Sequence, residues 1–115
     1  MRFRLLNVYL LAGLSAASCG STEGRFTVAN RATEPIKQIV VTICGQTIAL
    51  GPIDPQRTAV GAYNVTSDSH FVIDLTFVSG KTLHKEDGYV TNGVAYRHEI
   101  VVKNSEITLV VIEVS

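Results

Sequence analysis

The chain has 115 residues, of which 46% are hydrophobic and 17% charged, with ten basic and ten acidic side chains. This composition is typical of a folded protein, and the length fits one domain rather than a disordered chain. The balanced charge supplies no basic surface, so nucleic acid is excluded as an expected partner.

The first nineteen residues form a three-part segment. Arg2 and Arg4 give it a positive start, and Leu5–Leu14 is apolar apart from Asn7. Small residues then lead directly to a cysteine. This order is typical of a secretory signal. The apolar run is too short to span a bilayer, which needs about 20 residues.

The end of this segment resembles the lipobox of bacterial lipoproteins, and the resemblance covers Leu14–Cys19. Ala17 fits the family pattern, and Ser18 is a less common variant of it. Ala16 departs from the usual Leu. The resemblance implies that the preceding peptide is removed and that Cys19 carries fatty acids such as palmitate.

Three readings of this segment remain open. The lipoprotein resemblance divides the chain into a signal peptide (1–18), a lipidated cysteine with a short linker (19–24) and a domain (25–115). Gly20, in place of the Asp that favours inner-membrane retention, implies the outer membrane, with the domain facing the periplasm. The alternatives are ordinary secretion after cleavage near Ala17 or Ser18, or a short anchor that is never cut.

The small polar residues Gly20–Gly24 are typical of a linker. Five extended residues reach about 17 Å at most, so the domain is expected to lie close to the membrane. Loss of Arg2 and Arg4 leaves 8 basic and 10 acidic residues, a formal charge of 8 − 10 = −2.

The rest of the chain alternates between β-branched or aromatic stretches and turn residues. The clearest alternation places Phe71, Ile73, Leu75 and Phe77 on one face of a strand, which predicts the centre of the core. Strands are expected, in chain order, over 25–29, 36–44, 47–50, 57–65, 70–78, 81–85, 94–102 and 106–114.

About eight strands without a helix predict an all-β domain, an antiparallel β-sandwich of immunoglobulin-like arrangement. A small β-barrel is the alternative. The chain lacks Trp and a cysteine pair between sheets, which are the usual marks of immunoglobulin domains.

One loop, expected over Glu86–Gly93, is a candidate protein-contact site. Its Asp-Gly and Asn-Gly pairs indicate turns. An exposed Tyr89 between them would anchor a partner, because aromatic residues carry much of the binding energy at interfaces. The alternative is that Tyr89 folds back over the end of the sandwich. The residues assigned to this contact are Asp87, Tyr89, Val90 and Asn92.

The remaining candidates for chemistry are three histidines and one cysteine. His70 and Asp74 lie about 13 Å apart along one strand, too far to share an ion unless another strand intervenes. His84 is expected to be solvated beside Glu86. His98 alternates with apolar residues, so a half-buried position with a hydrogen-bond partner is expected.

Cys44 is expected to be a small buried residue in a strand. An intermolecular disulfide, or a bridge to an unlipidated Cys19, is the alternative. Signatures of hydrolases, zinc peptidases and phosphate-binding loops are absent from the sequence. We therefore expect no catalytic residues, no metal and no cofactor.

These observations favour a non-enzymatic, membrane-anchored lipoprotein of the bacterial envelope that acts as a protein-binding or structural module. The membrane, through Cys19, and an envelope protein are its expected partners. The alternative is a periplasmic enzyme or metal carrier that uses the histidines or Cys44.

Overall fold

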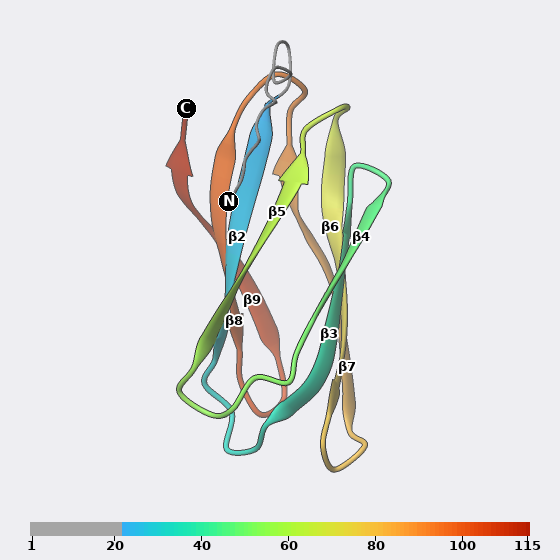
Figure 1. Ribbon diagram of the computed structural model, residues 1–115, viewed down its shortest axis with the longest axis vertical. Helices are drawn as coiled ribbons and strands as arrows, with labels where there is room; N and C mark the ends of the chain where they lie inside the picture. Colours follow the sequence, from blue (N-terminus) through green and yellow to red (C-terminus); the bar gives the residue numbers. More distant parts are fainter. Residues whose placement is uncertain (1–21) are drawn as a thin grey trace, which may run out of the picture.

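The computed structural model describes residues 22–115, which form eight β-strands (Figure 1). The predictions for residues 1–21, including lipidation of Cys19, lie outside the described part. No helix in the described part is long and apolar enough to cross a membrane. The strands are β2 (Glu23–Asn30), β3 (Ile36–Ile43), β4 (Gln46–Leu50), β5 (Thr58–Asn64), β6 (Ser69–Phe77), β7 (Thr82–Val90), β8 (Tyr96–Val102) and β9 (Ile107–Val114).

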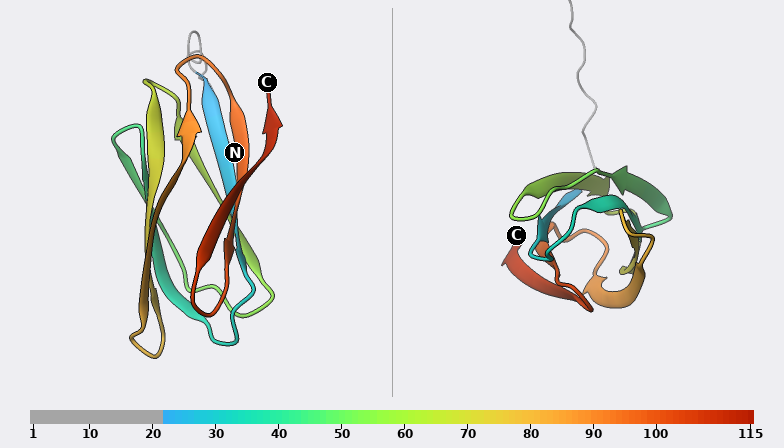
Figure 2. Two further views of the ribbon diagram at one scale, coloured as in Figure 1. Left: turned by 180° about the vertical axis from the view of Figure 1, so that it is seen from behind. Right: turned by 90° about the horizontal axis from the view of Figure 1, so that it is seen from below.

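Two four-stranded sheets pack face to face, with strand orders β5-β2-β8-β9 and β4-β3-β6-β7 (Figures 1 and 2). The chain passes between the sheets after β2, β4, β5 and β7. This arrangement confirms the predicted all-β sandwich of about eight strands. The sheets do not close into the barrel that was the alternative.

One strand pair departs from the antiparallel expectation, because β2 runs parallel to β8 with Arg25 beside Arg97 and Val28 beside Ile100. A parallel neighbour requires a long crossover, and here the chain between β2 and β8 builds the other sheet before it returns. Local alternation of residues carries no information about such a distant partner.

The inner face of β6 lies at the centre of the core, as predicted. Phe71, Ile73, Leu75 and Phe77 are at most 3% exposed. They meet apolar side chains of both sheets, so each period-2 stretch buries one face. The other large side chains that are under 2% exposed are Phe26, Val28, Ile36, Ile39, Val41, Ile43, Val90, His98, Ile100 and Val102.

Strand β5 contains small residues because one of them, Gly61, leaves room for an aromatic ring of β2. Gly61 pairs with Phe26, and a Cβ on Gly61 would lie 2.2 Å from the Phe26 ring. Two residues along the strands the roles are exchanged: the glycine is Gly24 of β2, and a Cβ on it would lie 2.2 Å from the ring of Tyr63 of β5. Each glycine therefore lets the opposite aromatic ring cover the strand.

The loop expected over Glu86–Gly93 is mostly strand, which corrects both that prediction and the short strand expected over 81–85. Strand β7 continues to Val90, and its register with β6 shifts between Asp87 and Tyr89. Gly88, at φ 71°, sits within that irregularity. The Asp-Gly pair thus forms a bulge inside a strand rather than a hairpin turn.

The two sheets also meet along both sides of the sandwich. On one side the Gln46 side-chain amide donates to the Asn64 carbonyl at 2.7 Å and accepts from the Asn64 N–H at 2.9 Å. On the other side Leu109 of β9 packs so close to Gly88 of β7 that a Cβ there would lie 2.0 Å from it.

Candidate functional site

The most distinctive surface lies at the end of the sandwich where β2 begins, here called the N-terminal end. Strand β8 starts at this end beside β2, and β9 finishes there, with Val114 paired with Tyr96. The backbones of Ala95 and Ser115 exchange two hydrogen bonds, of 3.0 and 2.8 Å, and so hold the end of β9 to the chain before β8.

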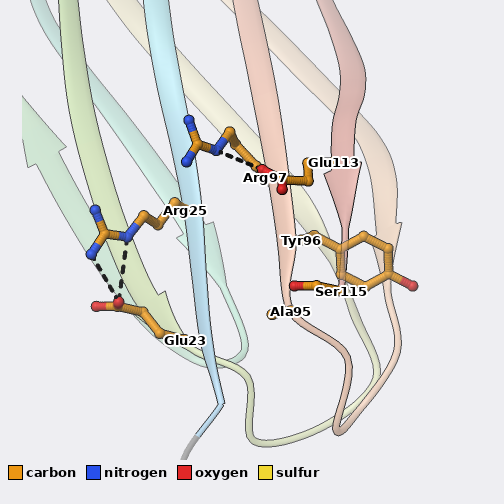
Figure 3. A pocket seen from close by; sticks show the side chains of 7 residues that line it. All are labelled: Glu23, Arg25, Ala95, Tyr96, Arg97, Glu113 and Ser115. Carbon is orange, nitrogen blue, oxygen red and sulfur yellow. Dashed lines mark hydrogen bonds and ion pairs between the residues drawn. The ribbon is translucent and has the colours of Figure 1, made fainter.

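A shallow hollow of about 260 Å³ opens on the outer side of these three strand ends (Figure 3). Two ion pairs line it: Arg25 with Glu23 of the same strand at 3.1 Å, and Arg97 of β8 with Glu113 of β9 at 3.4 Å. All four side chains are more than half exposed, so each pair contributes little to stability. The residues that line the hollow are Glu23, Arg25, Ala95, Tyr96, Arg97, Glu113 and Ser115.

The hollow is polar, and its positive and negative charges balance. Each guanidinium is matched by a carboxylate of the same sheet, and the lining includes no His, Cys or Lys. The hollow offers contact area, hydrogen-bonding groups and two ion pairs.

The predicted protein-contact residues occupy the same end but differ in exposure. Tyr89 is 59% exposed, and its hydroxyl donates to Asp68 at 3.2 Å. Asp68 also accepts the backbone N–H of Asn92 at 2.8 Å. Val90 is completely buried, so it is not available to a partner as predicted. Protein contact through exposed Asp87, Tyr89 and Asn92 stays a prediction.

A chain of four polar side chains lies on the outer face of β6 and β7. His84 places Nδ1 2.6 Å from Asp74 and Nε2 3.1 Å from Glu86, whose other oxygen lies 3.4 Å from His70 Nε2. The register produces this chain, because Asp74 pairs with His84. Strand β7 therefore bridges His70 and Asp74, because its residues Glu86 and His84 contact one of them each.

Hydrogen bonds set the proton affinities in this chain. The bonds to Asp74 and Glu86 raise the pKa of His84 above its usual 6.5, because both carboxylates accept from the protonated ring. The bonds from His84 and His70 lower the pKa of Glu86 below its usual 4.5. No group of three or more His, Cys, Asp or Glu side chains within residues 22–115 is arranged to hold a metal ion.

His98 is buried more deeply than expected and lacks the expected partner. It is 0% exposed, and within the described residues neither ring nitrogen has a hydrogen-bond partner. The ring of Phe71 meets it edge-on and that of Tyr96 lies tilted against it, with ring centroids at 4.7 and 5.5 Å. Burial lowers the pKa of His98, because the charged ring would lose its hydration.

Two further polar groups lie in the core near this end. Burial is the main reason that the pKa of Tyr63 is raised to about 12, and its hydroxyl finds no partner among the described side chains. Cys44 is buried, as predicted, but in the turn after β3, where its Sγ lies 3.4 Å from the Ser67 carbonyl. Neither group faces a cavity that would hold a substrate.

Sequence reasoning missed the hollow and the polar chain for the same reason. Both are made by residues of adjacent strands, and the choice of neighbour follows from topology. The alternation of His84 with Glu86 did place them on one face, which was the available signal.

Comparisons with known proteins support the fold alone. No family model matches the chain, and no curated protein matches it. A solved structure described as the NMR structure of the protein from Eubacterium rectale is similar, with a TM-score of 0.60 and 14% sequence identity. The similarity covers 84% of this chain and 94% of that one. At this identity the chain and that protein share a sandwich architecture.

Proposed function

We propose that this chain is a lipid-anchored module of a bacterial cell envelope that binds or supports other envelope proteins and performs no catalysis. One observation carries the proposal: the charged, apolar and small-residue segment ends in Cys19, and strand β2 begins only four residues later, at Glu23. Two acyl chains would suffice for stable anchoring.

The short connection supports a position close to the membrane. Three residues, 20–22, separate Cys19 from β2, which starts two residues earlier than the sequence predicted. The four steps from Cys19 to Glu23 span about 14 Å at most. The N-terminal end of the sandwich would therefore face the lipid, and the opposite end would face the periplasm.

Labelled palmitate tests the anchor, and the chain provides its own control. Expressed in a bacterium, the full chain is expected to incorporate the label, and Cys19→Ala is expected to lose it. Cys44→Ala removes the other cysteine of the chain and is expected to keep the label. A soluble product with an unmodified Cys19 would end the proposal.

The binding role requires a separate experiment. Crosslinking in intact envelopes, followed by purification of the chain, is expected to recover a second protein whose yield falls on Tyr89→Ala. Val78→Ala, which alters a comparably exposed side chain of 55%, is the control. Recovery of the bait alone across several growth conditions would count against this role.

A second candidate, a metal carrier, would use the chain of Asp74, His84, Glu86 and His70, which gathers two imidazoles and two carboxylates but is not arranged to hold a metal ion as it stands. Histidine is the commonest metal ligand in proteins. Metal analysis of the purified mature domain tests it, since a stoichiometric metal lost on His84→Ala would support it. A clean blank would remove it.

A further inference from the structure

The C-terminal half of β9 exposes apolar side chains without a cover. Val110, Val111, Ile112 and Val114 are 49–57% exposed. Here they are called the β9 patch. Earlier in the strand, Ile107 is buried and Leu109 packs against Gly88 of β7. Beyond Leu109 the strand stays paired with β8 as far as Val114, and as the edge strand it has no neighbour in the sheet on its other side (Figure 1).

The β9 patch has a defined place at the N-terminal end. Val114 pairs with Tyr96, which lines the same hollow as Glu23 at the start of β2 (Figure 3). Val110 pairs with Glu99, further along β8. The patch therefore extends about 14 Å from this end, at about 3.4 Å per residue.

The length of chain before β2 fixes how far this end can lie from a bilayer. If Cys19 is acylated, as the proposed function requires, Glu23 lies within about 14 Å of the acylated residue. The polar region of each leaflet is itself about 5–7 Å thick. We infer that the β9 patch is a membrane-contact surface, which lies on the interface of the bilayer that holds the anchor.

The charges near the patch allow such a contact. Residues 107–112 carry no charge, and Glu113 next to them is paired with Arg97. The β9 patch therefore presents uncharged apolar side chains to the lipid.

A second copy of the chain is the main competing occupant, because an uncovered edge strand is a template for another strand. Two β9 edges related by a two-fold axis pair antiparallel, which directs their N-terminal ends to opposite sides of the dimer. Two copies anchored in one leaflet could pair in that way only if both domains lay flat along the bilayer, so that neither N-terminal end faced it. The short link to Cys19 thus favours the membrane over a second copy.

Tryptophan fluorescence can locate the patch, because the natural chain has no Trp. The variants Val114→Trp and Val110→Trp place the probe at the two ends of the patch. Val78→Trp is the matched control, since Val78 is 55% exposed in the β6–β7 turn at the far end. Each lipidated variant is reconstituted into phosphatidylethanolamine–phosphatidylglycerol vesicles that contain brominated lipid.

Quenching is expected to follow distance from the anchor. Emission from Val114→Trp should fall about twofold or more, that from Val110→Trp should fall less, and that from Val78→Trp should stay unchanged. Equal emission from Val114→Trp and Val78→Trp in protein that floats with the vesicles would overturn the membrane contact and leave the anchor standing. Failure of the Cys19-containing protein to float would contradict the anchor, and the contact with it.

The natural sequence provides a second measurement that no introduced Trp can bias. Amide hydrogen exchange over residues 107–115 should slow about threefold in vesicles relative to the soluble Cys19→Ser variant, with no change over residues 77–82. Unchanged exchange over residues 107–115 would overturn the contact. A crosslink between two β9 strands, dependent on protein concentration, would assign the patch to a second copy instead.

Discussion

Strand β9 is richer in apolar residues than β6, yet its side chains are far less buried. In β6, Phe71 and Ile73 are fully buried, because β3 and β7 flank the strand and the other sheet covers its inner face. In β9, Val111 and Ile112 are about half exposed at the edge of the other sheet. Burial thus depends on the place of a strand in its sheet, which hydrophobicity alone does not determine.

The largest effect is expected at the centre of β6. Phe71→Ala should reduce the free energy of unfolding by about 3–5 kcal/mol, because it leaves a cavity among the rings of Phe26, Tyr63 and His98. Urea denaturation measures this as a lower midpoint with an unchanged slope. A loss below about 1 kcal/mol would show that this region is not tightly packed.

The same substitution in the two strands tests the comparison directly. Ile73→Thr should cost about 2–4 kcal/mol, because it removes buried methyl groups and buries a hydroxyl. Ile112→Thr should change stability by less than about 0.5 kcal/mol in the soluble domain, because its side chain is 54% exposed. Similar losses at both positions would mean that β9 is covered in solution.

His98 lies between the two regions, in edge-on contact with the ring of Phe71 of β6 and paired with Val111 of β9. His98→Leu should stabilise the domain by about 1 kcal/mol at neutral pH, since it removes buried polar atoms that lack partners. Urea midpoints of the two proteins measure the gain, and His70→Gln on the surface should leave them unchanged.

The same variant should alter the dependence of stability on pH. The folded pKa of His98 lies below 6.5, so the unfolded chain takes up a proton first as the pH falls. The contribution of His98 is therefore complete above pH 6.5 and decreases as the pH falls toward the folded pKa. His98→Leu should lose this component, and an identical pH profile would contradict the buried, neutral ring.

The smallest effect is expected on the outer face of β6. The pKa of His84 should be measured above 6.5 by NMR titration, and Asp74→Asn should lower it. This raised pKa stabilises the fold below pH 6.5, and the contribution disappears as the pH rises through the folded pKa. An unshifted His84 would show that its two carboxylates are hydrated instead.

The sequence predicted most strands because alternation is local. The pattern from Phe71 to Phe77 identified the centre of the core, and the β6–β7 turn at Ser79-Gly80 was also correct. The prediction was wrong at Asp87-Gly88: these residues were expected to form a turn but form a bulge, because the chain continues to pair with β6. Local turn preference lost there to the hydrogen bonds of a neighbouring strand.

The candidate site was less predictable than the fold. Exposure of Tyr89 was one of two readings left open by the sequence. Burial of Val90 was not expected, because the residues were assigned to a loop and not to the alternating strand β7. The parallel pairing of β2 with β8 places Glu23 and Glu113 in the lining of one hollow, and no short-range sequence pattern predicts this pairing. Residues that are neighbours only across the strands of a sheet can be grouped only when the strand order is known.

The Gln46 side chain has a consequence for how the domain avoids open-ended assembly. Its amide occupies both backbone groups of Asn64, so a foreign strand would have to displace two hydrogen bonds to add at that point. Strands β4 and β5 thereby shield each other from fibre growth without being paired as a ladder. A single glutamine side chain thus hinders the addition of a foreign strand at this edge of the sandwich.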